Sequence, residues 1–206
     1  MKIVIVADDN QKAELGTPTT EPEIVWVNDL SEINIEADIV IDLAFTAATE
    51  HINKLKKVNA GIKIINSVTH TLSETDKTFV RINGWSTFLS SQIIEAASHN
   101  DSDKEKVEEV FKLFSKEIQW VPDEAGFITP RVISMIINEA YIILEEGVST
   151  KEEINTAMKL GTAYPFGPFE WAEKIGFSRI SPLLQKLGEK ENKYLPCKLL
   201  LEESNF

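Results

Sequence analysis

The sequence predicts an N-terminal α/β domain built on a parallel sheet, followed by an all-helical domain. In the first part of the chain, short β-branched runs alternate with helical segments, which is typical of parallel strands joined by right-handed crossovers. From Gly126 to Gly176, by contrast, apolar residues recur at helical spacing. We therefore predict an α/β domain over residues 1–122 and a helical domain over residues 123–206.

The first two predicted strands stand close together in the chain. Lys2 to Ala7, KIVIVA, is a β-branched run that predicts a buried strand, and Glu23 to Val27 predicts a second one. Gly16 to Pro22, GTPTTEP, is rich in proline and threonine and indicates a loop. The stretch between the two strands therefore leaves room for one or two helical turns at most.

Three more strands and two helices complete the predicted α/β domain. Asp38 to Phe45 and Ile62 to Asn66 are predicted strands, and a helix is expected between them from about Ala47 to Val58. Asp101 to Ile118 is predicted to be an amphipathic helix, followed by a short strand at Gln119 to Pro122. Trp85 and Trp120 are expected to pack in the core rather than against a ligand.

The helical domain is predicted to begin with an unusually apolar helix from Pro130 to Glu146. Gly147 is expected to end it, and Ser149-Thr150 followed by Glu152-Glu153 predicts a capping box that starts the next helix. The apolar residues of the first helix occupy nearly all of its faces: Val132, Ile133, Met135, Ile136, Ile137, Ala140, Tyr141, Ile142, Ile143 and Leu144. Such a helix is expected to be buried on most sides.

A proline-rich elbow is predicted after the second helix, which ends at Gly161. Tyr164 to Pro168, YPFGP, places prolines at the start of a third helix, where a proline is tolerated. The inner face of that helix is expected to present Phe169, Trp171, Ala172 and Ile175. A final helix is predicted from Phe177 to Glu189.

Composition restricts the classes of function. The chain has 206 residues, of which 43% are hydrophobic and 26% charged, as in an ordinary globular protein. We see no apolar run long enough for a membrane span and no signal-peptide pattern. The net charge of −12 disfavours nucleic acid and anionic membranes as partners. The single cysteine, Cys197, fits a reducing cytoplasm, and we expect no metal site.

Four short motifs follow one another in the helical domain: Gly126-Phe127-Ile128, Asn138-Glu139-Ala140, Thr156 to Gly161, and Pro165 to Pro168. This segment closely resembles the C-terminal domain of the L-3-hydroxyacyl-CoA dehydrogenases. The resemblance covers about Asp38 to Glu189 and is strongest in its last third. It implies a Rossmann-like first domain, which the short stretch between the first two strands indicates is curtailed here. Together with the apolar helix 130–146 it also implies a homodimer formed through that helix, and an acyl-CoA ligand.

The resemblance also implies NAD as the cofactor, but the cofactor-binding positions are altered. A dinucleotide-binding fold needs glycines after the first strand, so that the backbone can approach the pyrophosphate. Asp8 and Asp9 stand there instead. An acidic residue and a lysine that face the cofactor in the family correspond to Thr46 and His51. Three nearby lysines, Lys54, Lys56 and Lys57, are expected to form a solvated helix face rather than a phosphate site.

The catalytic positions are altered as well. In the family, a histidine takes the proton of the substrate hydroxyl while its hydrogen leaves as hydride, and a glutamate, an asparagine and a serine complete the hydrogen bonds. These four positions correspond to Ser86, Ser98, Pro130 and His70, respectively. Serine has no useful basicity at neutral pH, and proline offers only a carbonyl.

Two alternatives remain open for the polar residues. His70 or His99 could replace the lost histidine as a base, with Glu95 as its partner. Arg131 and Glu139 keep their family positions, and we interpret them as a structural ion pair or a helix cap rather than as catalytic groups. We therefore predict a family member that does not perform the family reaction. The alternative is an active NAD(P)-dependent oxidoreductase, acting on an acyl-CoA or another hydroxy compound, with relocated catalytic groups.

Overall fold

The computed structural model describes residues 1–20 and 23–204, which form two compact units. The first unit is Met1–Phe127 and the second is Ile128–Phe206. Residues 123–127, which were predicted to open the helical domain, belong to the first unit, where Asp123 pairs with Arg81 and the Gly126 N–H donates to the Val68 carbonyl at 2.8 Å. No helix in the described residues is both long and apolar enough to cross a membrane.

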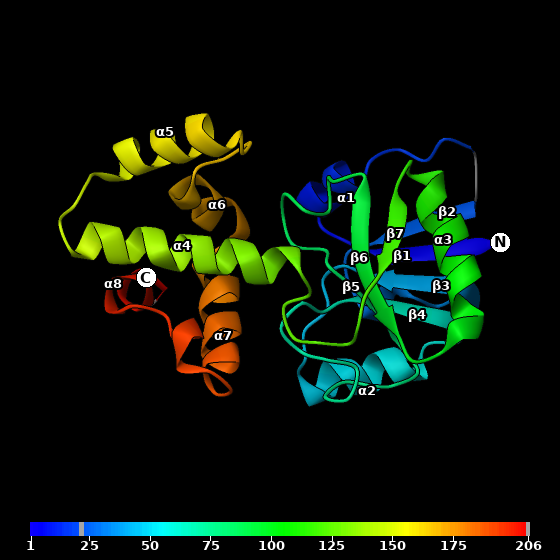
Figure 1. The fold of residues 1–206 in the computed structure, drawn as a ribbon. Helices are drawn as coiled ribbons and strands as arrows, with labels where there is room; N and C mark the ends of the chain where they lie inside the picture. Colours follow the sequence, from blue (N-terminus) through cyan, green and yellow to red (C-terminus); the bar gives the residue numbers. More distant parts are fainter. Residues whose placement is uncertain (21–22, 205–206) are drawn as a thin grey trace. The chain divides into compact units, whose positions relative to one another are not determined.

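The first unit is a seven-stranded sheet in the order β2-β1-β3-β4-β5-β6-β7, so that β2 and β7 are its edges (Figure 1). All neighbouring strands are parallel except β5 and β6, which are antiparallel. The strands are β1 (Lys2–Val6), β2 (Glu23–Val27), β3 (Ala37–Asp42), β4 (Ala60–Asn66), β5 (Val80–Ile82), β6 (Ile93–Ser98) and β7 (Glu117–Trp120). The predicted fold class, a parallel sheet followed by helices, is confirmed.

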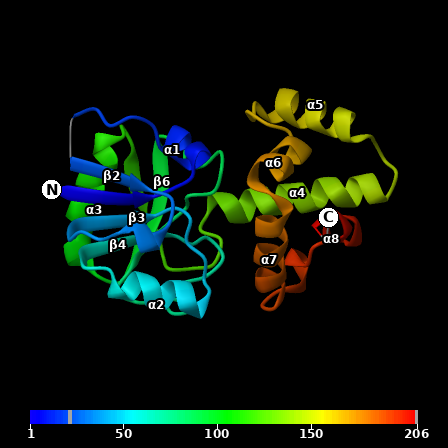
Figure 2. The same ribbon diagram turned by 180° about the vertical axis from the view of Figure 1, so that it is seen from behind.

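Helices cover both faces of the sheet. Helix α1 (Asp9–Leu15) and helix α3 (Lys104–Leu113) lie on one face, and α2 (Thr49–Lys57) lies on the other, as Figure 2 shows from behind. Each face has its own apolar core: Leu15 and Phe111 belong to the first, and Leu55 and Phe79 to the second. Short 3-10 turns at Leu30–Glu32 and Asp101–Asp103 complete the unit.

Three elements of this unit differ from the prediction. Strands β5 and β6 were not predicted, because β5 has three residues and β6 ends in the small residues Ala96, Ala97 and Ser98. The helix predicted over Asp101–Ile118 ends at Leu113 instead. Ser115 adopts a left-handed backbone conformation with φ 56°, which breaks the helix before β7 begins.

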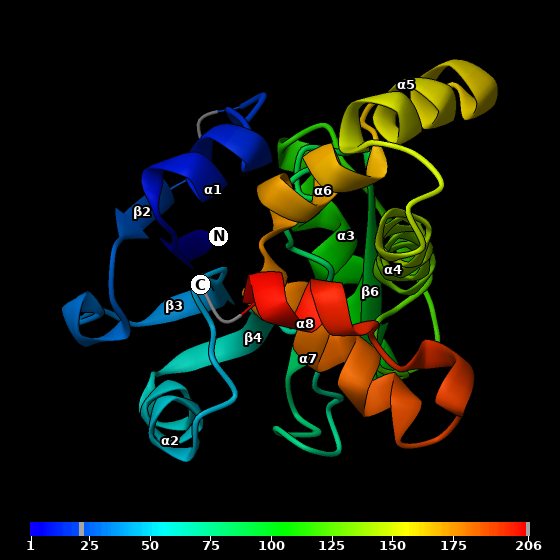
Figure 3. The ribbon, with the colours of Figure 1, turned by 90° about the vertical axis from the view of Figure 1, so that its left-hand side faces the viewer.

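The second unit consists of helices, seen from the side in Figure 3. They are α4 (Thr129–Glu145), α5 (Lys151–Thr162), α6 (Pro168–Ile175), α7 (Phe177–Gly188) and α8 (Lys198–Ser204), with a 3-10 turn at Asn192–Tyr194. Gly147 follows α4 with φ 70°. Thr150 and Glu153 form the predicted capping box at the start of α5, and Phe169, Trp171, Ala172 and Ile175 of α6 are buried as predicted.

The C-terminal helix α8, which was not predicted, is fixed by polar contacts to the rest of the second unit. Tyr141 donates a hydrogen bond to Glu203 at 2.5 Å, and Lys151 pairs with the same carboxylate at 2.5 Å. The buried Asn138 side chain holds the segment before α8, because it donates to the Leu195 carbonyl and accepts from the Cys197 N–H. Asn138 of the family-like motif therefore has a structural role here.

Candidate functional site

The place for a ligand in a sheet of this topology is the crevice where the strand order reverses, at the carboxyl ends of the strands. Here that crevice lies between β1 and β3, because the chain moves outward from β1 to β2 and then crosses to β3 on the other side. Asp8 follows β1, Asp42 ends β3 and Asn66 ends β4. These residues, with those of the neighbouring loops, form the candidate site.

The helix that starts at this crevice has its N-terminus occupied by a carboxylate of the chain itself. Asp8 Oδ1 accepts from the Gln11 backbone N–H at 2.8 Å, and Gln11 Oε1 accepts from the Asp8 N–H at 3.0 Å. In dinucleotide-binding proteins these first N–H groups face the pyrophosphate. Helix α1 also has only 7 residues, about 10 Å of helix. The residues present therefore do not fit a dinucleotide.

Side-chain amides hold the bottom of the crevice together. Gln11 Nε2 donates to the Leu43 carbonyl at 2.7 Å, and Asn66 Nδ2 donates to the same carbonyl at 3.1 Å and to the Gly84 carbonyl at 3.0 Å. Gly84 returns a backbone N–H to Asn66 Oδ1 at 3.0 Å. A β-carbon at Gly84 would lie 2.8 Å from the Asn66 side chain, which explains the glycine. These bonds tie α1, β3, β4 and the segment after β5 to one another.

Ser86, at the position of the family histidine, bonds to a carboxylate. Its Oγ donates to Glu14 Oε1 at 2.5 Å, and the Thr87 N–H donates to Glu14 Oε2 at 3.1 Å. Thr87 has φ 75°, a left-handed conformation unusual for threonine. The loop after β5 is therefore attached to α1 by the Glu14 carboxylate.

The other three family positions lie on separate elements. Ser98 ends β6 and its Oγ donates to the Asn100 carbonyl at 3.1 Å. Pro130 is buried in the first turn of α4. His70 is exposed in the loop after β4, where its carbonyl accepts from Arg81 at 3.0 Å. The Ser86 hydroxyl bonds to Glu14, the Ser98 hydroxyl to the Asn100 carbonyl, and the His70 carbonyl to Arg81.

Two of the possible replacement residues, Glu95 and His99, lie in β6 and directly after it, respectively. Glu95 is buried in β6 and accepts from Asn83 Nδ2 at 3.2 Å. His99 Nε2 lies 3.3 Å from Asp123 Oδ2, and 44% of its side chain is exposed. The His99 imidazole is thus oriented by Asp123 rather than by Glu95.

Among the cofactor-position residues, His51 has the most distinctive surroundings. Its Nε2 lies 2.6 Å from Asp42 Oδ2, and the Asp42 side chain is completely buried. Burial raises the pKa of the Asp42 carboxyl, and the hydrogen bond and charge of His51 oppose that shift. Thr46, by contrast, is exposed, and Asp9 lies in the first turn of α1.

Arg81 is a buried charged residue in β5 that was not predicted from the sequence. Its side chain is fully buried, its Nε lies 2.7 Å from Asp123 Oδ1, and its guanidinium lies over the Phe127 ring at 4.0 Å. Burial lowers the pKa of Arg81 to about 10, although Asp123 opposes this. The signal was present in the sequence, because Phe79-Val80-Arg81-Ile82 is an apolar run interrupted by one arginine.

Arg131 and Glu139, which were interpreted as an ion pair or cap, lie in α4. The Arg131 guanidinium lies 5.9 Å from the centre of the Tyr194 ring, and Glu139 is exposed.

Trp85 is buried, as expected. Trp120 is partly buried, packs against the apolar core that contains Phe111, and donates a hydrogen bond to Glu108 at 2.8 Å. In residues 1–20 and 23–204, no three acidic, histidine or cysteine side chains are grouped to hold a metal ion.

The charge of the first unit opposes an anionic cofactor. Residues 1–127 contain 22 Asp and Glu against 12 Lys and Arg, so they carry −10 of the total charge of −12. Lys54 pairs with Glu50 at 2.9 Å and Lys56 with Asp76 at 2.7 Å. The lysine group of α2 is therefore largely neutralised by its own neighbours.

The Lys56–Asp76 pair makes stability depend on pH in the acid range. Burial raises the pKa of Asp76, but hydrogen bonds from Lys56 and Thr78 outweigh burial and lower this pKa from 3.8 to about 2. A depressed pKa stabilises the folded state above pH 3.8, and this stabilisation is lost as the pH falls toward 2. Since Lys56 is half exposed, we expect the pair to contribute about 1 kcal/mol to the free energy of unfolding. Asp76→Asn should remove this acid-range slope in urea titrations between pH 4 and 2, whereas Asp101→Asn, at an exposed pair, should leave most of it.

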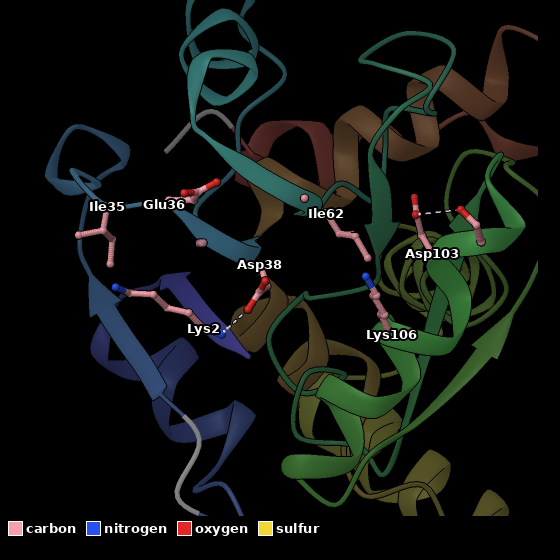
Figure 4. Close-up of a pocket in the computed structure, with 10 residues that line it drawn as sticks. Lys2, Ile35, Glu36, Asp38, Ile62, Asp103 and Lys106 are labelled. Carbon is pink, nitrogen blue, oxygen red and sulfur yellow. Dashed lines mark hydrogen bonds between the residues drawn. The ribbon is translucent and has the colours of Figure 1, made fainter.

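A large open depression lies at the opposite, amino end of the sheet (Figure 4). Its volume is about 880 Å³, and its lining includes Lys2, Asp38, Asp103 and Lys106. The Asp38 carboxylate accepts from the Lys2 backbone N–H at 2.7 Å, and Lys2 Nζ pairs with Glu23 at 3.1 Å. The depression combines carboxylates with lysines and is remote from the crevice, so we do not assign it to the cofactor.

Comparison with known proteins identifies both the second unit and its relatives. Residues 126–203 match the family model of the 3-hydroxyacyl-CoA dehydrogenase C-terminal domain. The chain is 37% identical over 114 residues to a 3-hydroxyadipyl-CoA dehydrogenase of Escherichia coli, covering 54% of this chain and 24% of that protein. It is 35% identical over 113 residues to a 3-hydroxybutyryl-CoA dehydrogenase of Bradyrhizobium diazoefficiens, covering 54% and 39% of the two chains.

A solved structure resembles a larger part of the chain. The (S)-3-hydroxybutyryl-CoA dehydrogenase of Ralstonia eutropha superposes with a TM-score of 0.71 at 25% identity, covering 87% of this chain and 69% of that one. The chain spans only about a quarter to two fifths of the length of the curated relatives cited above. With the matching C-terminal domain and the shared two-part fold, the chain belongs to the 3-hydroxyacyl-CoA dehydrogenase family.

Proposed function

We propose that this protein keeps the fold of its family but does not oxidise 3-hydroxyacyl-CoA with NAD by the family mechanism. The observation that carries this proposal is the carboxylate of Asp8 at the N-terminus of α1. A second anion at this helix terminus would meet the charge of Asp8, which already accepts from the Gln11 N–H. Ser86 in place of a basic histidine supports the same conclusion.

We propose an acyl-CoA as the ligand of this non-catalytic relative. The similar proteins are named as dehydrogenases of 3-hydroxyadipyl-CoA and 3-hydroxybutyryl-CoA. The ligand is thus retained while the cofactor is lost.

Two measurements test this function. Purified protein is mixed with NADH and acetoacetyl-CoA, and absorbance is followed beside an active family dehydrogenase; turnover above ~1 s⁻¹, within the normal enzyme range, would refute the proposal. In thermal shift, NAD should leave the melting temperature unchanged. Acetoacetyl-CoA at a hundred times its dissociation constant should stabilise the protein by about 2.7 kcal/mol.

An active oxidoreductase with relocated groups is the second candidate. What favours it is the presence of two carboxylate-paired imidazoles, His51 with Asp42 and His99 with Asp123. A carboxylate that orients an imidazole is a common arrangement for a general base. In this case the same assay shows turnover, and either His51→Gln or His99→Gln abolishes it.

We also propose a homodimer formed through the helix 130–146. In α4, Val132 is 49% exposed, and Met135, Ile136, Ile143 and Leu144 are only partly buried. Apolar side chains so numerous on one helix favour contact with a second copy. In sedimentation, Val132→Lys combined with Ile143→Lys should give a monomer, whereas Lys198→Glu, on the 80% exposed side chain of α8, should not.

The cytoplasm is the compartment that we propose, with neither nucleic acid nor membrane as a partner. The only cysteine, Cys197, is partly buried, and burial raises the pKa of its thiol, so it is kept mainly in the protonated, less reactive form. The acidic net charge of −12 supports the exclusion of polyanionic partners. Fractionation of cells that express the tagged protein tests the compartment.

A further inference from the structure

We infer that Asp42 and His51 form a binding site for the hydroxyl group of a small neutral ligand, or of a neutral part of a larger one. The site lies at the carboxyl end of β3, beside the crevice where α/β proteins bind ligands. The inference goes beyond the proposed function, because it requires neither the family reaction nor the family cofactor. It rests on the geometry of one buried carboxylate and one partly exposed imidazole.

The buried carboxylate fixes which ring nitrogen carries the proton. Asp42 Oδ2 lies 2.6 Å from His51 Nε2, and the side chain is 0% exposed. Among the described residues, the other oxygen, Oδ1, is buried without a hydrogen-bond partner. Since an ionised carboxylate can only accept, His51 Nε2 donates the proton. The Asp42 charge thus acts on the His51 imidazole and on the Ala44 backbone N–H, and His51 is its side-chain partner.

The second ring nitrogen of His51 is left as an acceptor. Nδ1 has no hydrogen-bond partner in the part of the chain that the structure describes, and 21% of the side chain is exposed. The Phe45 ring meets the imidazole edge to face, with centroids 5.2 Å apart and planes at 79°. The ring is thus held in place by an aromatic neighbour and a carboxylate, with a free lone pair on its remaining nitrogen.

The other paired imidazole lacks these properties. Asp123, the partner of His99, also contacts the Arg81 guanidinium at 2.7 Å and accepts from the Leu72 N–H at 3.0 Å. Its charge is therefore compensated by Arg81, and the His99 contact of 3.3 Å is longer. Of the two carboxylates, Asp123 has Arg81 as a second cationic partner, whereas Asp42, within the described residues, pairs with His51 alone among basic side chains.

The charges around His51 favour a neutral ligand group. Lys54, on the same helix, is paired with Glu50 at 2.9 Å, and Asp29 accepts from the Ser31 N–H at 2.8 Å. The charges of Asp29 and Asp42 disfavour an anion, while Lys54 disfavours an added cation. A hydroxyl donates to Nδ1 without adding a charge, and the Phe45 ring can contact the carbon chain that carries it.

Two substitutions separate binding from structure. His51→Gln keeps an N–H donor at the Nε2 position for Asp42 but removes the acceptor at Nδ1. His51→Asn places its amide near the Nδ1 position and loses the bond to Asp42. We expect His51→Gln to unfold like the wild type but to lose the hydroxyl preference. His51→Asn should be less stable, because a buried carboxylate is left unpaired.

The ligands form a matched pair as well. (S)-3-hydroxybutyryl-CoA and butyryl-CoA differ by one hydroxyl, and we expect the first to bind about tenfold tighter, the effect of one hydrogen bond. In ¹⁵N-histidine NMR the chain has 3 imidazoles to assign, and only the Nδ1 signal of His51 should move with the hydroxy ester. Equal affinities, or a preference retained in His51→Gln, would overturn the inference.

A neutral probe keeps the result independent of the acyl-CoA proposal. If neither ester binds, the acyl-CoA ligand of the proposed function is refuted, and the titration is repeated with 1,3-butanediol. A shift of the His51 Nδ1 signal with the diol, but not with a four-carbon compound that has no hydroxyl, supports the site. If His51 does not respond to the diol, the site is refuted.

Discussion

Replacing Arg81 with methionine should destabilise the protein by about 3–5 kcal/mol, the usual cost of leaving a buried charge without its partner. Arg81 is 0% exposed and lies 2.7 Å from Asp123, which is itself largely buried. It also donates to the backbone carbonyls of Ser67, Val68, His70 and Glu124. Methionine can fill the volume but offers none of these donors. Urea denaturation followed by circular dichroism measures the loss as a lower midpoint.

Two controls identify the cause of the Arg81 effect. Lys106→Met removes a cation from the open depression and should change the free energy of unfolding by less than about 0.5 kcal/mol, as surface substitutions usually do. Adding Asp123→Asn to Arg81→Met should restore part of the loss, because the unpaired charge disappears. A loss below about 1 kcal/mol for Arg81→Met would show that the guanidinium is not essential for stability.

Adding a single methyl group to each of two glycines in the second unit should have opposite effects. In Gly167→Ala, the new β-carbon would lie 2.2 Å from Asn155 Oδ1 and 2.6 Å from the Asn155 Cα, which is backbone and cannot move cheaply. Asn155 Oδ1 already accepts from the Phe169 N–H at 3.0 Å, so the elbow before α6 would be displaced. We expect a loss of about 1–3 kcal/mol, typical of overpacking.

Gly161→Ala is the matched control. Gly161 lies in α5, and its β-carbon would meet nothing within 4 Å. Alanine should therefore stabilise α5 by about 0.5–1 kcal/mol, through its better helix propensity. Calorimetric melting of both variants measures the difference; similar melting temperatures for the two would mean that the close approach of Asn155 is not what requires glycine at 167.

The parts of the fold that could be predicted are those in which local pattern and burial agree. The β-branched run of β1 and the apolar face of α6 were predicted within a residue or two, because each side chain's environment follows from strand or helix periodicity. Strand β5 was missed because its three residues include the buried Arg81, whose burial depends on Asp123, far away in the sequence.

The candidate site was predictable only in what it lacks. The absence of glycines after β1 could be read directly, and the structure shows Asp8 capping α1 there. The pairing of Asp42 with His51 could not be predicted by pattern, because one residue ends a strand and the other lies in the next helix, 9 residues later. Only the folded sheet end brings the two side chains together.

Strand β2 is the outermost strand on its side of the sheet, with β1 as its one hydrogen-bonded neighbour. Residues whose amides face β1 alternate with residues whose amides face outward, and Ala7 donates to the Val27 carbonyl, so the outward amides belong to Ile24 and Trp26. This border carries an apolar, β-branched sequence without proline, the composition that natural proteins usually interrupt to prevent unwanted strand addition. Concentrated or partly unfolded samples are therefore expected to self-associate first along this border.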